Sequence, residues 1–399
     1  MKILQLCHKP PLPAVDGGCI AMNNITQGLL QAGHKVKILT IYTHKHDFMP
    51  EIMSEEYLNE TGIEGVYVDT KISVVDAFSS FVTSDSYNLY RFFSTDYDIK
   101  LTRTLRSGSY DIIHLESLFM TPYIGTIRRF SKAPIVLRAH NLEFVIWEKI
   151  AKGTSNIFKK AYLTYLSRKL KAVELKTMNE VSGVAAISEE DKKRFEMLGI
   201  SSPITNIPFG IDYTAYQHCK IGEAEVALFH LGAMDWSPNI EGLQWFLNEV
   251  WPKVHDRFPN LKLYLAGRSM PKEFHALDIP MVEVVGEVED AKAFMCSKAV
   301  MIVPLLSAGG VRVKIIEGMA LGKAIVSTSI GAEGAEAIDN ENILIADSPG
   351  EWIKAIERLM HEKGLIERLG EGGRLHTRRF DNAAIINDLL NFYQTLRKK

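Results

Sequence analysis

The sequence contains only 4 cysteines among its 399 residues. They lie far apart, at Cys7, Cys19, Cys219 and Cys296. Neither the spacing of metal ligands nor the density of a disulfide scaffold is present. We therefore interpret all four as unpaired, buried or inert thiols, and we expect no metal site.

Long apolar runs and a surplus of one charge are also missing. No stretch approaches the roughly 20 apolar residues of a transmembrane helix, and no continuous apolar segment precedes a small-residue cleavage site at the N-terminus. The 46 Lys and Arg against 48 Asp and Glu give no strongly basic balance of the kind that nucleic-acid binding needs. These absences predict a cytoplasmic protein, at most peripheral at the inner face of the cell membrane, that does not bind nucleic acid.

Short apolar runs do alternate with helical patterns along the whole chain. A length of 399 residues predicts two domains of ordinary size. In the first half, strands are expected at 2–6, 36–41, 112–115, 135–137 and 184–187. The segment 43–97 has a weaker pattern, and we assign it no structure.

A second alternating series follows a polar stretch, 206–225, that suits an interdomain connection. Helices are expected at 241–255 and 312–321, and strands at 227–231, 261–266, 282–285, 299–303, 324–327 and 343–345. Strands that alternate with helices imply a parallel sheet covered on both faces.

The predicted fold class is therefore α/β, with two tandem Rossmann-like, doubly wound domains. We assign 1–208 to the first and 209–380 to the second, and 381–399 to a C-terminal helix that is a candidate to cross back to the first domain. Ligands of such sheets bind outside the carboxyl ends of the strands, so we expect a cleft between the two domains.

The most informative segment is 303–322, in which a strand enters a small-residue turn and leaves as a helix. The free backbone N–H groups of such a turn, with the helix dipole behind them, form an anion site. Gly309 and Gly310 let the backbone approach a phosphate, and Arg312 and Lys314 add cationic donors. A tight turn with solvated side chains is the alternative, but the combination of these residues favours a nucleotide diphosphate.

Glu317, in the helix that follows, offers acceptor oxygens to ribose hydroxyls. The whole segment resembles the donor-binding signature of family-4 glycosyltransferases, which are retaining enzymes with the GT-B fold. That family has two glutamates separated by seven residues. Glu317 matches the second, which typically binds the donor ribose, whereas Gly309 stands where the first usually contacts the donor sugar. The variant Gly-Gly-x-Arg-x-Lys of some bacterial members implies that backbone groups of Ala308, Gly309, Gly310 and Val311 take over that contact.

The resemblance extends over essentially the whole chain. Gly17 and Gly18 resemble the family's N-terminal glycine loop, which lies against the donor phosphates and the acceptor, although a simple strand-to-helix turn gives the same pattern. Asp16 is a candidate either to orient an acceptor hydroxyl or to cap the helix start. His140 matches a histidine that the family places beside the donor sugar, and a structural histidine is the alternative. Glu116 follows another strand and is a further candidate, either functional or structural.

In the second domain, Gly286 and Glu287 resemble the loop whose backbone recognises the nucleobase. The family often has Gly-Arg and Lys-Gly pairs whose cations contact the diphosphate, and neither pair occurs in 231–239. The resemblance therefore leaves Arg312 and Lys314 as the predicted phosphate partners. With Asp16 and His140, they are the catalytic candidates.

The resemblance implies a metal-independent, retaining glycosyltransferase without a cofactor, active in polysaccharide biosynthesis. Its partners would be a nucleotide sugar, such as a UDP- or GDP-sugar, and a glycan, lipid-linked or other acceptor. A nucleotide-sugar epimerase of the same fold and a non-catalytic nucleotide-sugar-binding protein are alternatives. An NAD-dependent oxidoreductase is disfavoured because no Gly-x-Gly-x-x-Gly follows the first strand.

The segment 158–178 combines many Lys and Arg residues with apolar residues at helical spacing. This pattern predicts either peripheral contact with anionic lipid or a solvated helix packed on its own domain.

Overall fold

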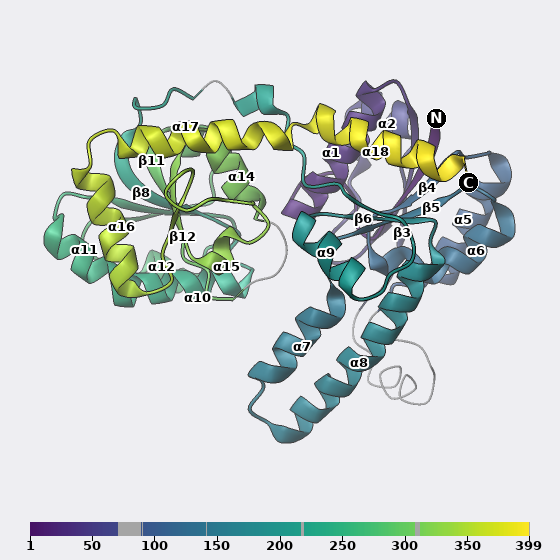
Figure 1. Ribbon diagram of the computed structural model, residues 1–399, viewed down its shortest axis with the longest axis horizontal. Helices are drawn as coiled ribbons and strands as arrows, with labels where there is room; N and C mark the ends of the chain where they lie inside the picture. Colours follow the sequence, from purple (N-terminus) through teal and green to yellow (C-terminus); the bar gives the residue numbers. More distant parts are fainter. Residues whose placement is uncertain (71–88, 90, 141, 217–218, 308–311, 399) are drawn as a thin grey trace. The chain divides into compact units, whose positions relative to one another are not determined.

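The computed structural model describes all residues except 71–88, 90, 141, 217–218, 308–311 and 399. The chain forms two compact units. The first consists of Met1–Gly210 together with Asn382–Lys399, and the second of Ile211–Asp381. Each unit is built on a parallel sheet flanked by helices (Figure 1). The predicted α/β class with two parallel-sheet domains is confirmed.

The first unit contains a seven-stranded sheet in the order β3-β2-β1-β4-β5-β6-β7. Its strands are β1 Lys2–Cys7, β2 Lys35–Tyr42, β3 Glu64–Tyr67, β4 Ile112–Leu115, β5 Ile135–Ala139, β6 Gly183–Ala186 and β7 Ile204–Asn206. Every residue of β4, β5 and β6 is buried, as expected for parallel strands covered on both faces. Because all pairings are parallel, the carboxyl ends of the strands lie along one edge of the sheet.

Helices cover both faces of this sheet. They are α1 Gly17–Gln31, η1 Pro50–Ile52, α2 Glu55–Thr61, α5 Thr95–Ser107, η2 Leu118–Tyr123, α6 Ile124–Phe130, α7 Glu143–Gly153, α8 Ile157–Glu180, α9 Glu189–Met197 and α18 Asn382–Arg397. One apolar core gathers side chains of α5, α6 and α8, and another gathers those of α1, α2 and α18. The sheet edge at β3 lies within 43–97, the segment to which the sequence pattern gives no assignment.

The last helix, α18, belongs to the first unit although the second unit precedes it in the chain. The hydroxyl of Tyr393 lies 2.6 Å from Nδ1 of His114 in β4. A Cβ added at Gly28 of α1 would overlap the side chain of Ile386, so this glycine allows the two helices to approach closely. Buried polar and apolar contacts together fix α18 to the first unit.

The second unit contains a six-stranded sheet in the order β10-β9-β8-β11-β12-β13. Its strands are β8 Glu225–Leu231, β9 Leu263–Ala266, β10 Val282–Gly286, β11 Lys298–Val303, β12 Ala324–Ser327 and β13 Leu344–Ile345. Its helices are η3 Tyr213–Tyr216, α10 Ser237–Trp245, η4 Phe246–Val250, α11 Trp251–Arg257, α12 Lys272–His275, α13 Ala291–Cys296, α14 Val313–Ala320, α15 Ser329–Ala332, α16 Pro349–His361, α17 Leu365–Thr377 and η5 Arg378–Phe380.

The helix expected at 241–255 is in fact three consecutive pieces. A π-helical turn, Phe246–Val250, separates α10 from α11. Pro252 at the start of α11 has no N–H to donate, so a regular α-helix cannot continue through it with all its hydrogen bonds.

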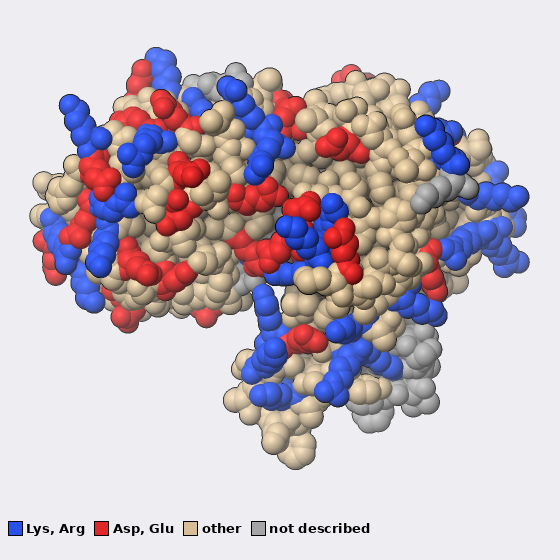
Figure 2. Space-filling view, in the orientation of Figure 1, with Lys and Arg blue, Asp and Glu red and all other residues tan. Residues whose placement is uncertain are grey.

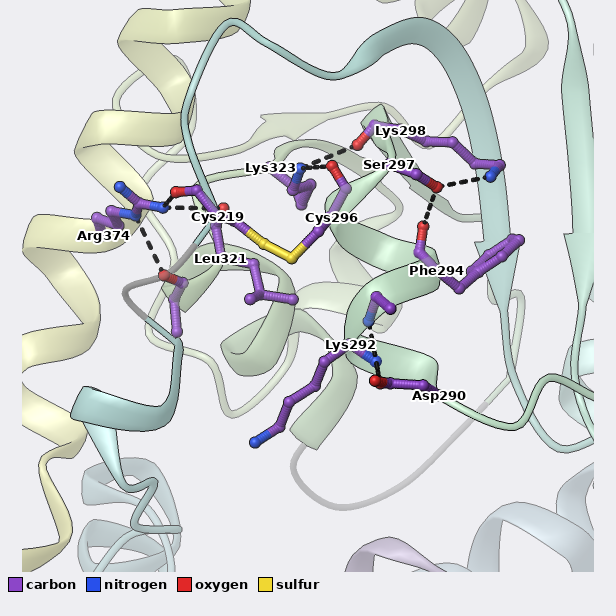
Figure 3. The surroundings of a disulfide bond; sticks show 12 residues. Cys219, Asp290, Lys292, Phe294, Cys296, Ser297, Lys298, Leu321, Lys323 and Arg374 are labelled. Atoms are coloured by element: carbon purple, nitrogen blue, oxygen red, sulfur yellow. Dashed lines mark hydrogen bonds between the residues drawn. A yellow bond between two sulfur atoms is a disulfide. The ribbon is translucent and has the colours of Figure 1, made fainter.

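Cys219 and Cys296 form a disulfide in the second unit, with their Cα atoms 5.5 Å apart (Figure 3). The interpretation of all four cysteines as unpaired is therefore wrong for these two. Sequence spacing gives no hint of the bond, because 77 residues separate the partners. They meet because each stands shortly before one of two neighbouring strands, Cys219 before β8 and Cys296 before β11.

Basic side chains surround the disulfide. The Arg374 guanidinium donates to the carbonyl oxygens of Cys219 and Ala320, and the Lys323 ammonium donates at 3.1 Å to that of Cys296 (Figure 3). Arg374 therefore ties the segment before β8 to the end of α14. The segment expected as an interdomain connection is in this way largely part of the second unit.

Candidate functional site

Three polar side chains meet at the carboxyl edge of the first sheet. His8, Glu116 and His140 each follow directly after one of the strands β1, β4 and β5, which are neighbours in the sheet. His8 donates through Nδ1 to the backbone oxygen of Glu116 at 3.0 Å. Nε2 of His140 lies 3.3 Å from Oε2 of the Glu116 carboxylate. The strand order thus brings together residues that are far apart in the sequence.

Glu116 is fully buried and surrounded by positive and hydrogen-bonding groups. Gln5 donates to its Oε1 at 2.8 Å, His114 Nε2 lies 3.3 Å from the same oxygen, and Arg138 lies 3.6 Å from Oε2. Burial acts to raise the pKa of Glu116, but these neighbours outweigh it and hold the pKa well below its usual range. The carboxylate is therefore ionised and fixes the orientation of His140.

Both histidines of this edge favour the neutral form. Burial lowers the pKa of His8 to about 3, helped by the charge of Lys9. Burial also lowers the pKa of His140, and the charge of Arg138 adds to this, against the opposing effect of Glu116. Because His140 directs Nε2–H toward Glu116, its neutral ring keeps an acceptor at Nδ1.

We expect His8 to contribute a fall in the free energy of unfolding as the pH is lowered from about 6.5 toward 4. A histidine whose folded pKa is depressed gives stability that is present above its unfolded pKa of about 6.5 and is lost as the pH falls toward the folded value. For His8 the loss is at most about 1.4 kcal/mol per pH unit. Urea unfolding at pH 7 and pH 5 measures it. His8→Gln should flatten the dependence and His361→Gln, on the exposed side of α16, should not. An equal pH dependence of the wild type and His8→Gln would contradict the expectation.

The glycine loop after β1 is organised by Asp16. Its carboxylate caps α1 by accepting from the N–H of Cys19 at 2.9 Å, and it binds Lys9 at 2.7 Å and His46 at 3.1 Å. Burial opposes ionisation, but these partners lower the pKa of Asp16 far below its usual value. A Cβ at Gly18 would lie 2.8 Å from the Lys9 ammonium nitrogen, so a larger residue there would require the Lys9 side chain to move. The structure gives Asp16 the capping role, and its orienting role toward an acceptor stays a prediction.

In the second unit, Glu317 lies on α14 and is only 6% exposed. The Tyr216 hydroxyl donates to its Oε1 at 2.8 Å, and the Lys314 ammonium lies 3.1 Å from its Oε2. Burial raises the pKa of the Tyr216 phenol, and the adjacent Glu317 carboxylate raises it further. A neutral phenol and a cation thus hold one carboxylate in a single orientation. Lys314, predicted to contact phosphate, pairs with Glu317 in this structure.

Arg312 precedes α14, and its guanidinium lies 5.4 Å from the ring centre of Trp236. Burial lowers its pKa to about 10, against the opposing charge of Glu333, so the side chain keeps its charge at neutral pH. Trp236 therefore acts as a platform for a cation. The neighbouring positions predicted to contact the donor, Ala308, Gly309, Gly310 and Val311, lie outside the described residues.

Glycines end three adjacent strands of the second sheet. Gly267, after β9, has a φ of 152°, and a Cβ there would overlap the carbonyl oxygen of Gly232, which follows β8. The N–H of Gly267 donates at 2.7 Å to the carbonyl oxygen of Gly286, the last residue of β10. Gly286 is buried and the next residue, Glu287, is exposed. Glycine at these strand ends therefore lets the backbone segments approach one another closely, next to the position predicted to recognise a base.

Two residues that contact the predicted site are missed by sequence reasoning. Tyr216 is 101 residues from Glu317, and no local pattern links them. His8, in contrast, comes two residues after the predicted strand 2–6 and could have been found by the same rule as His140. Within the described part of the chain, no three His, Cys, Asp or Glu side chains gather in a way that could hold a metal ion. Likewise, no described helix is long and apolar enough to cross a membrane.

Two family models match the chain. The model described as "Glycosyltransferase Family 4" matches residues 15–215, and the one described as "Glycosyl transferases group 1" matches residues 225–362. Among curated proteins, an "Uncharacterized 44.6 kDa protein in cps region" of Klebsiella pneumoniae is 25% identical over 358 residues, which is 87% of each chain.

Solved structures share the fold over nearly the whole chain. A sucrose-phosphate synthase from Thermosynechococcus elongatus superposes with a TM-score of 0.71 at 15% identity and covers 99% of both chains. Anabaena HepE in complex with UDP gives a TM-score of 0.67 at 15% identity, over 99% of this chain and 100% of that one. These likenesses agree with the family models, and the chain therefore belongs to glycosyltransferase family 4.

Proposed function

We propose that this glycosyltransferase moves a sugar from a nucleotide-sugar donor to a glycan or lipid-linked acceptor, with retention of configuration and without a metal ion. The observation that carries the proposal is the buried Glu317 carboxylate, which Tyr216 and Lys314 hold in one orientation. A carboxylate fixed in this way can accept hydrogen bonds from both hydroxyls of a ribose. Because its side chain is already ordered, little conformational entropy is lost when a nucleotide binds.

The departing diphosphate needs positive charge beside it. Arg312, held over Trp236, presents a planar guanidinium that can bind phosphate oxygens through two parallel hydrogen bonds. Lys314 can move from Glu317 to a phosphate once ribose hydroxyls engage the carboxylate. We propose that stabilisation of the leaving group by these cations replaces a divalent ion.

On the first unit, we propose that His140 contacts the transferred sugar. Its ring is fixed by Glu116, and its neutral form supplies an acceptor without adding a charge next to the anionic donor. A positioned neutral group of this kind lowers the barrier mainly by orientation. Asp16, Gly17 and Gly18 border the same sheet edge and are proposed to contact the acceptor.

UDP-sugars are the first donors to test. Anabaena HepE has been solved in complexes with UDP and with UDP-glucose, and it shares the fold of this chain. The Klebsiella relative in a cps region supports a polysaccharide or its precursor as the acceptor.

Nucleotide binding can be tested by thermal shift, because a ligand that binds only the folded state raises the melting temperature. We expect UDP to raise it, by an amount that corresponds to about 2.7 kcal/mol at a hundred times the dissociation constant. GDP and ADP serve as comparison ligands, and a larger shift with either of them than with UDP would identify a preference for another base. The absence of a shift with every nucleoside diphosphate and every nucleotide sugar would contradict the proposal.

One observation keeps a second candidate open. Gly309 stands where family members usually have a glutamate, so a protein that binds a nucleotide sugar without transferring it is the alternative. Donor binding without transfer to any acceptor would favour it. Conversion of the donor sugar without an acceptor would instead indicate an epimerase, and the anomeric configuration of a transfer product would test retention.

A further inference from the structure

A helical hairpin projects from the first unit. It consists of α7 and α8, which pack against each other and meet at the short turn 154–156 (Figure 1). At its base, the Glu174 carboxylate accepts from the N–H groups of Glu143 and Phe144, both at 3.1 Å. Buried hydrogen bonds therefore join the two helices at the base of the hairpin, while its other end reaches away from the sheet (Figure 1).

Two leucines in the middle of α8 are not available to a membrane. Leu163 and Leu170 are buried, and the same buried stripe also contains Ser167 and Glu174. A helix of this kind cannot lie flat in a bilayer surface, because its apolar side already packs inside the protein. The lipid-contact alternative given for 158–178 must therefore be sought at the tip of the hairpin.

Two large apolar side chains stand side by side at that tip. Ile157 is 75% exposed and Phe158 is 85% exposed. Four exposed lysines surround them in the sequence of the hairpin: Lys149, Lys152, Lys159 and Lys160. Between 144 and 173 the chain holds seven Lys and Arg and a single acidic residue, Glu148. Figure 2 shows Lys and Arg side chains over this lobe and an uncharged surface at its end.

We propose that the hairpin tip, 149–160, docks on an anionic lipid surface, with Ile157 and Phe158 inserted among the acyl chains and the lysines against the headgroups. Exposed aromatic and aliphatic side chains at the end of an element enter the headgroup boundary readily, and each nearby lysine adds attraction to anionic lipid. Lysine chemistry favours lipid over a protein partner, because protein interfaces are depleted in Lys and enriched in Arg. Within residues 149–160, all of which the structure describes, every positively charged side chain is a lysine.

The test is cosedimentation of the full chain with vesicles. We expect binding to vesicles of equal parts phosphatidylglycerol and phosphatidylcholine, and at least about tenfold weaker binding to pure phosphatidylcholine. Ile157→Ser with Phe158→Ser, and separately Lys159→Glu with Lys160→Glu, should each weaken binding to the anionic vesicles about tenfold or more. Leu375→Ser, at a 65% exposed apolar residue of α17, and Lys253→Glu on α11 are matched controls that should bind like the wild type.

Equal binding to both vesicle types, no binding to either, or unchanged binding of the tip variants would overturn the proposal. The proposal would also be overturned if the wild type self-associates, the tip variants abolish this self-association, and lipid has no effect. The tip would then be a contact between copies of this chain. The proposal does not depend on the donor. UDP thermal shifts of the tip variants should equal those of the wild type, so failure of lipid docking and failure of nucleotide binding are distinguishable.

Discussion

Glu317→Ala is expected to lower kcat/KM for sugar transfer at least about tenfold. The substitution removes a charged acceptor from the proposed ribose site, and a lost charge-assisted hydrogen bond of about 1.5–3 kcal/mol corresponds to a factor of about 10 to 100. It also leaves the Tyr216 hydroxyl and the Lys314 ammonium without their shared partner. Steady-state transfer from a UDP-sugar measures the effect, with UDP affinity measured in parallel.

Two further variants separate the roles of the neighbours. Arg312→Ala should lower transfer by at least about tenfold and weaken binding of UDP itself, because its proposed target is the diphosphate. Tyr216→Phe, which keeps the ring but not the donor to Glu317, should have a smaller effect. Glu371→Ala, at an exposed position of α17, is the matched control for loss of a carboxylate. Full activity of both Glu317→Ala and Arg312→Ala would refute the proposed donor site.

Glu116→Ala is expected to destabilise the first unit by about 3–5 kcal/mol. The substitution leaves the buried Arg138 guanidinium without its counter-charge, which is the costly way to break a buried ion pair, and it removes the hydrogen-bond partner of Gln5 and His140. Glu116→Gln should cost less, because an amide can still accept from Gln5. Urea unfolding followed by fluorescence measures both changes.

The second unit provides an internal check on that result. Glu116 belongs to the first unit, so the thermal shift that UDP produces should persist in a Glu116→Gln protein that remains folded. If the free energy of unfolding of Glu116→Ala lies within about 1 kcal/mol of that of the wild type, the groups around Glu116 do not form the buried charge network described above.

The regular elements could be predicted from the sequence because buried parallel strands are short, nearly continuous apolar runs. The runs 112–115 and 324–327 coincide with β4 and β12 to the residue. Strand ends also predict candidate residues, as His140 and Glu116 illustrate. Contacts between residues that are distant in the sequence could not be predicted. They depend on the arrangement of the elements in the fold, and no local sequence pattern indicates that arrangement. This explains why the pairing of Cys219 with Cys296 and the contact of Tyr216 with Glu317 were missed.

The basic segment after 158 shows a different limit. Helical spacing indicates which residues share a side of a helix, but not whether protein or solvent faces that side. Leu163 and Leu170 have the spacing expected for either case, and only the packing of α8 within the first unit decides it.

The return of α18 to the first unit has a consequence for the order of folding during synthesis. The second unit is one continuous stretch, 211–381, whereas the first needs residues from both ends of the chain. During translation the second unit can complete its core while the first still lacks Tyr393 as a partner for the buried His114. Until α18 has been synthesised, the apolar side chains that share a core with Ile385, Ile386 and Leu389 lack the cover of that helix. We therefore expect the first unit to complete its core after the second.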